Sequence, residues 1–142
     1  MERHESYRKY ATEMLKRAPL VEVAKETLRE EIRYLRGELS TCRLAALVGN
    51  REEERRNKLM GKLEDAAFRL RELEKETEKI RRGMEALNPY QQDLLDAFFV
   101  HRRKDCVEEL SERYCKERSA IYRDRKTALE QFTLTALGAL PI

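Results

Sequence analysis

The sequence predicts an all-α protein, with a long helical hairpin or coiled coil followed by a C-terminal unit of three short helices. Three observations lead to this prediction. Charged residues make up 40% of the 142 residues, Gly and Pro number only 5 and 3, and Trp is absent, a composition typical of long helices. Apolar residues recur every three or four positions over most of the chain. Near the C-terminus, helix start and stop signals separate three short apolar segments.

The N-terminal third is expected to hold two helices separated at Pro19, over residues 7–16 and 20–36. Proline lacks a backbone N–H and disfavours helix at the residue before it, so an interruption is expected at Ala18. The second helix carries an apolar stripe at spacings of three and four, formed by Val21, Ala24, Leu28, Ile32, Leu35 and Leu39. Gly37, Ser40-Thr41 and Gly49-Asn50 indicate a looser connection after it.

The most regular pattern is a heptad seam over residues 59–87. Its positions alternate in steps of four and three, and all but Thr77 are apolar. We expect oligomerisation through Leu59, Leu63, Leu70, Leu73, Ile80, Met84 and Leu87, with Ala66 completing the seam. In a parallel dimer, Arg69 would face Glu74 and Glu76 would face Arg81. The alternative is that the seam packs within the chain, antiparallel to residues 20–39, as in an αα-hairpin.

Residues 88–142 are predicted to form a second domain after the helical region 1–87. Asn88 is an N-cap, Pro89 occupies the first helical position and Gln91 can complete a capping box, which begins a helix extending to about Val100. Asp105 should cap a second helix, over residues 107–114, with Glu108 at its third position. After a break near Cys115-Lys116, the last helix is expected from about Arg118 to Phe132. The end of the chain is apolar and is expected to pack back or fray.

Two short helices joined by three or four residues and preceded by a third form a helix-turn-helix unit. In such a unit the second helix of the pair enters the DNA major groove, and basic residues neutralise phosphates. Residues 113–126 hold six basic and two acidic side chains, although a basic helix face is more often simply solvated. The candidate DNA-binding residues are Arg118, Ser119, Tyr122, Arg123 and Lys126 on the second helix, with Arg102, Arg103, Lys104 and Lys116 in the flanking turns.

The segment CVEELSERYCKERSAIYRDRKTAL, residues 106–129, resembles region 4 of bacterial sigma factors and, more closely, phage transcriptional regulators of the RinA/ArpU type. The resemblance covers about residues 84–132. It implies a sigma-like helix-turn-helix that binds double-stranded DNA, and activation of phage or prophage late genes in the bacterial cytoplasm. Three positions depart from the family pattern: Cys115 stands where glycine is favoured, Glu117 where Ser or Thr caps the helix, and Asp124 where many relatives are apolar.

Other classes of function are weaker on the sequence. His4 and His101 are isolated, the three cysteines are widely spaced, and no Gly-rich phosphate loop occurs, so we expect no enzyme, metal site or cofactor. The N-terminus has no apolar signal region, and the longest apolar run, Leu44–Val48, is too short to span a membrane. The expected partners are DNA and a second copy of the chain, with RNA polymerase as a further candidate. The alternatives are a coiled-coil adaptor and a subunit similar to the phage small terminase.

Overall fold

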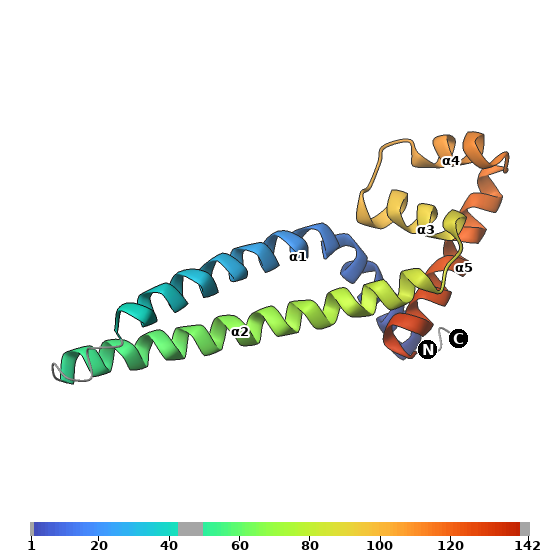
Figure 1. Ribbon diagram of the computed structural model, residues 1–142. Coiled ribbons are helices and arrows are strands. Elements are labelled where there is room, and N and C mark those ends of the chain that lie inside the picture. The colour runs from blue at the N-terminus through green and yellow to red at the C-terminus, as the bar shows by residue number, and fades with distance from the viewer. Residues whose placement is uncertain (1, 43–49, 140–142) are drawn as a thin grey trace. The chain divides into compact units, whose positions relative to one another are not determined.

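The computed structural model describes residues 2–42 and 50–139, and these are helical throughout except at turns and caps. The helices are α1 (Glu2–Thr41), α2 (Asn50–Glu85), α3 (Pro89–Leu95), the π-helical turn η2 (Asp96–Val100), α4 (Cys106–Tyr114) and α5 (Arg118–Leu137), shown in Figure 1. The predicted all-α class is confirmed. The apolar run Leu44–Val48 and the predicted loop residue Gly49 lie outside the described residues.

Helix α1 is continuous through Pro19, so the predicted break at Ala18 is wrong. A proline in a helix removes one hydrogen bond, here the one to the carbonyl of Leu15, but leaves the remaining backbone pairs available. Apolar side chains lie buried on both sides of it, including Leu15 and Val21. Burial of both flanking stripes therefore outweighs the local preference against helix before proline.

The chain divides into two compact units. One contains residues 21–75 and the other contains residues 1–20 and 76–142. This division differs from the expected domains 1–87 and 88–142, because both the first turns of α1 and the last turns of α2 share a core with α5. The sequence places these three segments far apart, and no periodicity within one helix can indicate which of the others it contacts.

The unit of residues 21–75 is a helical hairpin of α1 and α2. Its hairpin core consists of the buried residues Leu28, Ile32, Leu35 and Ala66, against which Leu59, Leu63, Ala67, Leu70 and Leu73 pack. The N-terminal part of the heptad seam thus packs within the chain, in the antiparallel arrangement that an αα-hairpin requires (Figure 1). These side chains pack against α1 of the same chain. A dimer of intact hairpins therefore needs a different surface.

The charged residues that flank the seam also have partners within the chain. Arg69 lies 3.7 Å from Glu31 and 3.0 Å from Asp65. Arg81 pairs with Glu78 and Glu85 of its own helix, and Glu76 pairs with Arg17 of α1. The charged residues that were predicted to pair between chains therefore form ion pairs within the chain. Each such pair contributes little on an exposed surface.

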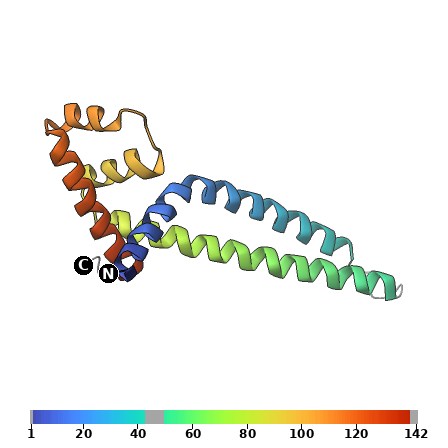
Figure 2. The ribbon, with the colours of Figure 1, turned by 180° about the vertical axis from the view of Figure 1, so that it is seen from behind.

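In the other unit, a bundle core joins α1, the end of α2 and α5. Its buried members are Ala11, Met14, Leu15, Leu87, Leu95, Ala128, Phe132 and Ala136, and the seam residues Ile80 and Met84 pack against it. Figures 1 and 2 both show the start of α1 beside the last turns of α5. Gly83 permits the close approach of α2 to α5, because a Cβ there would lie 2.5 Å from the Phe132 ring.

Helix α5 continues to Leu137, five residues beyond the predicted end at Phe132. The added turn buries Thr133 and Ala136, and the Thr133 hydroxyl donates a 2.7 Å hydrogen bond to the Leu129 carbonyl. Gly138 then ends the helix with a left-handed conformation, φ 66°. Of the two expectations for the C-terminal segment, packing back is correct as far as residue 139.

Candidate nucleic-acid interface

Helices α3, α4 and α5 enclose a small core of their own, which we call the three-helix core. Leu94, Ala97, Cys106, Leu110 and Ile121 are buried in it, and Figures 1 and 2 show the three helices as ribbons at one end of the chain. The N-terminus of α3 has the predicted capping box: the Asn88 side chain accepts from the Gln91 N–H, and the Gln91 side chain accepts from the Asn88 N–H. The three-helix arrangement predicted for residues 89–132 is present.

The turn between α4 and α5 is short and passes through a left-handed residue. Cys115 is left-handed, with φ 53° and ψ 46°. The Lys116 N–H donates a 3.1 Å hydrogen bond to the Ser111 carbonyl, and the Ser111 hydroxyl donates to the Lys116 carbonyl. The cysteine thus occupies the conformation that glycine adopts at least cost, and local hydrogen bonds hold it there.

Helix α5 begins at Arg118, as predicted, and its N-cap is weak. Glu117 is extended, with φ −67° and ψ 154°, and its side chain makes no capping hydrogen bond. The preceding helix differs more from expectation. Asp105 is left-handed at φ 61° and does not cap α4 with its side chain, so that predicted cap is wrong. In the left-handed conformation its carboxylate does not meet the free N–H groups of the first turn.

Asp124 connects the turn to α3 through hydrogen bonds of its side chain. Its Oδ2 accepts a 2.8 Å hydrogen bond from the Tyr90 hydroxyl and a 3.0 Å one from the Lys116 ammonium. The ammonium also lies 4.3 Å from the centre of the Tyr90 ring. The hydrogen bond from Tyr90, with that from Lys116, lowers the pKa of Asp124, while burial and the same bond raise the pKa of Tyr90. We call these three residues the turn clamp, because they join α3, the turn and α5.

A second polar cluster fixes α4 against α3. Asp93 accepts hydrogen bonds from the Tyr114 hydroxyl at 2.6 Å and from Arg113 at 2.7 Å. These bonds, the one from Tyr114 foremost, lower the pKa of Asp93. Tyr114 also meets Tyr90 edge to face, with ring centres 4.6 Å apart. The C-terminal end of α4 is therefore positioned by contacts within the three-helix unit.

The predicted DNA-binding residues fall into two groups. Ser119, Tyr122, Arg123 and Lys126 lie exposed on α5, and Arg102 and Lys104 lie exposed before α4. Arg118 is also exposed, although its guanidinium pairs with Glu108 at 2.6 Å. The other two are engaged within the fold: Arg103 lies 3.5 Å from Glu109, and Lys116 belongs to the turn clamp. The exposed side chains of the first group can meet an external anion, although Arg118 would give up its pair with Glu108 and Arg123 its 3.6 Å contact with Asp124.

Arg125, a basic residue of α5 outside the predicted set, packs on two aromatic rings. Its guanidinium carbon lies 4.7 Å from the centre of the Phe98 ring and 5.2 Å from that of Tyr122. The spacing of three residues from Tyr122 to Arg125 on one helix face could have indicated this contact. The involvement of Phe98 depends on the π-helical turn η2, which the sequence pattern does not reveal.

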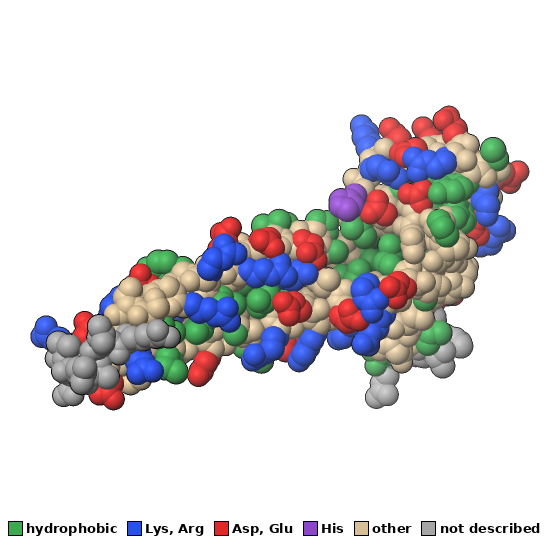
Figure 3. Space-filling view, viewed as in Figure 1, with side chains coloured by type: hydrophobic (Ala, Val, Ile, Leu, Met, Phe, Trp, Pro, Cys, Tyr) green, Lys and Arg blue, Asp and Glu red, His purple; other side chains and the backbone are tan. Residues whose placement is uncertain are grey.

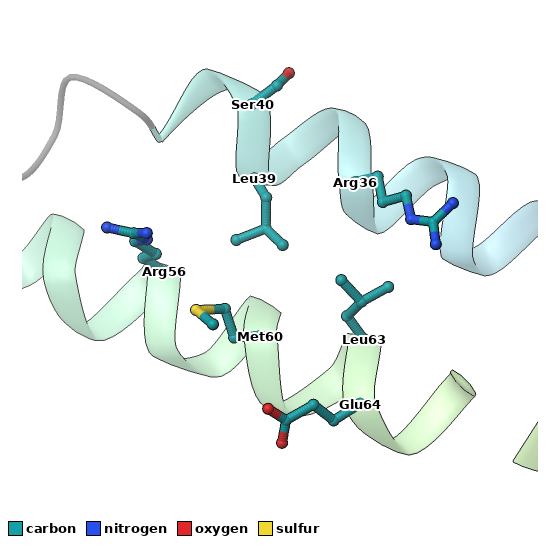
Figure 4. A pocket seen from close by; sticks show the side chains of 7 residues that line it. All are labelled: Arg36, Leu39, Ser40, Arg56, Met60, Leu63 and Glu64. Atoms are coloured by element: carbon teal, nitrogen blue, oxygen red, sulfur yellow. The ribbon is translucent and has the colours of Figure 1, made fainter. Parts of the chain in front are cut away.

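The hairpin has an open pocket lined by Leu39, Met60 and Leu63, with Arg36 and Arg56 at opposite ends (Figure 4). Ser40 and Glu64 complete the lining. A nucleophile with an adjacent base is not among these side chains, so the pocket suggests no reaction. Across residues 2–42 and 50–139, no group of three or more His, Cys, Asp or Glu side chains could hold a metal ion.

Comparisons with family models, curated proteins and solved structures find no match for this chain. None of the helices in the described ranges combines the length and apolar character that a bilayer crossing requires.

Proposed function

We propose that the protein is a sequence-specific, DNA-binding transcriptional regulator that reads the major groove with α5. The observation that carries this proposal is the exposed polar and basic face of α5, which follows directly on a left-handed turn in a three-helix unit. Recognition helices of this kind contact bases through their N-terminal residues. The sigma-like resemblance of residues 84–132 adds the proposal of a phage or prophage late-gene activator in the bacterial cytoplasm.

Each exposed side chain has a role that its chemistry suits. Arg123, whose side chain is 74% exposed, is the best candidate for bidentate hydrogen bonds to guanine. Ser119 and Tyr122 can contact neighbouring base edges or sugars, and Lys126 can contact a phosphate. Arg102 and Lys104 would contact the backbone beside the groove.

Two of the predicted DNA contacts are better assigned to the fold. Lys116 is bound to Asp124 and stacked on Tyr90, and Arg103 lies among Asp93 and Glu109. Their replacement should destabilise the three-helix unit before it changes any contact with DNA. We propose further that the protein acts as a homodimer on two half-sites, with RNA polymerase as a candidate partner of the activator.

Binding to duplex DNA over a range of salt concentrations tests the proposal. We expect R123A/K126A to weaken binding, and to reduce the slope of log K against log salt by about 0.9 for the one phosphate contact that Lys126 would make. The matched control is R71A/K79A, which removes the same charge from exposed positions on α2. No binding at low salt, binding without salt dependence, or equal losses in both variants would overturn the proposal.

An adaptor that docks a protein partner is the second candidate, since the hairpin exposes Val23 and Phe68 at 65% and 55%. Charge reversal at Arg123 and Lys126 separates the two functions, because an adaptor would keep its partner and would not have bound DNA. The small-terminase alternative shares DNA binding with the regulator and also includes oligomerising helices. Molar mass in solution distinguishes those two.

A further inference from the structure

The hairpin carries a second apolar surface apart from its core. Val23 and Phe68 are exposed large hydrophobic residues in a chain whose mean hydropathy is −0.79. Phe68 lines a groove of about 490 Å³ together with Ala24, Thr27, Leu28 and Leu73, and Val23 is one helical turn before Thr27. Figure 3 shows hydrophobic side chains exposed along the hairpin between rows of basic and acidic ones. We call the surface that holds Val23, Thr27 and Phe68 the groove face.

We propose that a second copy of this chain packs on the groove face, with a two-fold axis running along the hairpin. The inference rests on the homodimer included in the proposed function, but not on DNA binding. The heptad seam cannot serve this purpose in an intact hairpin, because Leu63 and Leu70 pack against α1 of the same chain. The groove face carries Val23 and Phe68, two of the exposed large hydrophobic residues of this unit.

The first argument for a second copy is the position of the groove residues along the helix axes. Phe68 and Thr27 line one groove and thus lie at one height along the two helices. A two-fold axis parallel to the helices keeps every residue at its own height and sets α2 of one copy against α1 of the other. Phe68 of each copy then lies opposite the groove of its partner, and both grooves are filled by one symmetric contact.

Charge is the second argument. Arg69 and Glu31 also line the groove and lie 3.7 Å apart within the chain. The proposed axis would bring two such pairs together with α2 facing α1, so that each Arg69 also approaches the Glu31 of the other copy. An axis across the hairpin at this height would instead set Glu31 against Glu31 and Arg69 against Arg69, which is unfavourable.

The available area is the third argument. The hairpin part of α1 has about 20 residues, or roughly 30 Å at 1.5 Å per residue, and a pair of helices is about 20 Å wide. A face of this size is comparable with the roughly 800 Å² that each partner contributes to a specific interface.

Molar mass of the full chain in solution, by light scattering over a concentration series, tests the proposal. We expect a dimer for the wild type, a shift to monomer by at least tenfold in Kd for F68E and for V23E, and no shift for M60E. Met60 is the matched control, because it is exposed on the hairpin but lines the other pocket. Helical circular dichroism checks folding, and V23E decides the matter if F68E fails to fold.

A crosslink tests the geometry directly. In a C115S background, a mixture of T27C chains and F68C chains should form a mixed disulfide dimer, and M60C in place of F68C should not. A monomeric wild type, a dimeric F68E and V23E, or equal crosslinking of the M60C control would overturn the proposal. A monomer that still binds DNA with a steep salt dependence would overturn this surface alone and leave DNA binding standing.

Discussion

At the turn before α5, a cysteine adopts a conformation that most side chains avoid. The left-handed region costs a residue with a Cβ about 1–2 kcal/mol relative to glycine, and Cys115 lies in it at φ 53°. The turn therefore stores strain that the hydrogen bonds of Ser111 and the turn clamp offset.

We expect C115G to be more stable than C115A by about 1 kcal/mol, since alanine keeps the strain and glycine removes it. The comparison with alanine, and not with the wild type, removes any effect of the lost thiol. Urea denaturation followed by circular dichroism measures the difference. A variant C115G that is no more stable than C115A would show that the turn is unstrained.

The turn clamp makes stability depend on pH. A carboxyl with a lowered pKa in the folded state, as at Asp124, adds stability above its unfolded pKa of about 3.9 and loses it as the pH falls further. We expect D124N to be less stable than the wild type by about 1 kcal/mol at pH 7, with the difference shrinking as the pH falls from about 4 towards 2. Thermal melts across this range provide the measurement. E112Q, at an exposed glutamate of α4, should show no such convergence.

Local features of single residues could be predicted from the sequence, whereas contacts between distant residues could not. The Asn88 cap and the position of the break near Cys115 depend on neighbouring residues, which the sequence displays. The turn clamp joins Tyr90 to Asp124 across 34 positions, and no local pattern signals that pair. Asp124 looked like a defect of the motif, whereas in the fold it is bound to Tyr90 and Lys116.

At the scale of the helices, α2 and α5 pack closely at Gly83. A Cβ at Gly83 would meet Phe132 at 2.5 Å and Ala136 at 3.0 Å. Both contacts are with buried side chains of the bundle core, so the ring must move or the helices must separate.

We expect G83A to destabilise the protein by about 1–3 kcal/mol through overpacking. The same substitution at Gly37, which has open space around the added methyl group, should instead stabilise by about 0.5–1 kcal/mol through helix propensity. Chemical denaturation of the two variants gives opposite shifts in midpoint. If G83A also stabilises, α5 does not pack on Gly83 in solution.

Helix existence was predictable, but helix ends were predicted less well. The seam at 59–87 identified α2 because eight of its nine positions are apolar, and heptad regularity needs no knowledge of the partner. The break at Pro19 was wrong because proline acts locally, whereas the stripe it interrupts is buried on both sides. The extension of α5 to Leu137 depends on burial of Thr133 and Ala136, which only the packed chain defines.

Across the whole molecule, the hairpin core and the three-helix core have no residue in common. Each core depends on a few fully buried leucines, such as Leu35 and Leu110, which are 4% and 0% exposed. Loss of a buried leucine side chain typically costs 2–5 kcal/mol. A substitution in one core should therefore lower the stability of the helices around that core.

We expect L35A to lower amide hydrogen-exchange protection in residues 21–42 and 50–75 by about 2–5 kcal/mol while protection in α3–α5 changes little. L110A is the reciprocal variant and should lower protection in α3–α5. Exchange followed by mass spectrometry on peptides resolves the two. A uniform loss of protection in both variants would mean that the chain unfolds as one cooperative unit.

The three cysteines make the turn before α5 a convenient place for a reporter group. Cys42 and Cys106 are buried, whereas Cys115 is exposed, and an accessible thiolate is the form that reacts with labelling reagents. A maleimide dye or spin label added to the unmodified protein should therefore attach mainly at Cys115. Such a probe would sit three residues before α5, where its signal tests the proposed contact of α5 with DNA without any engineered mutation.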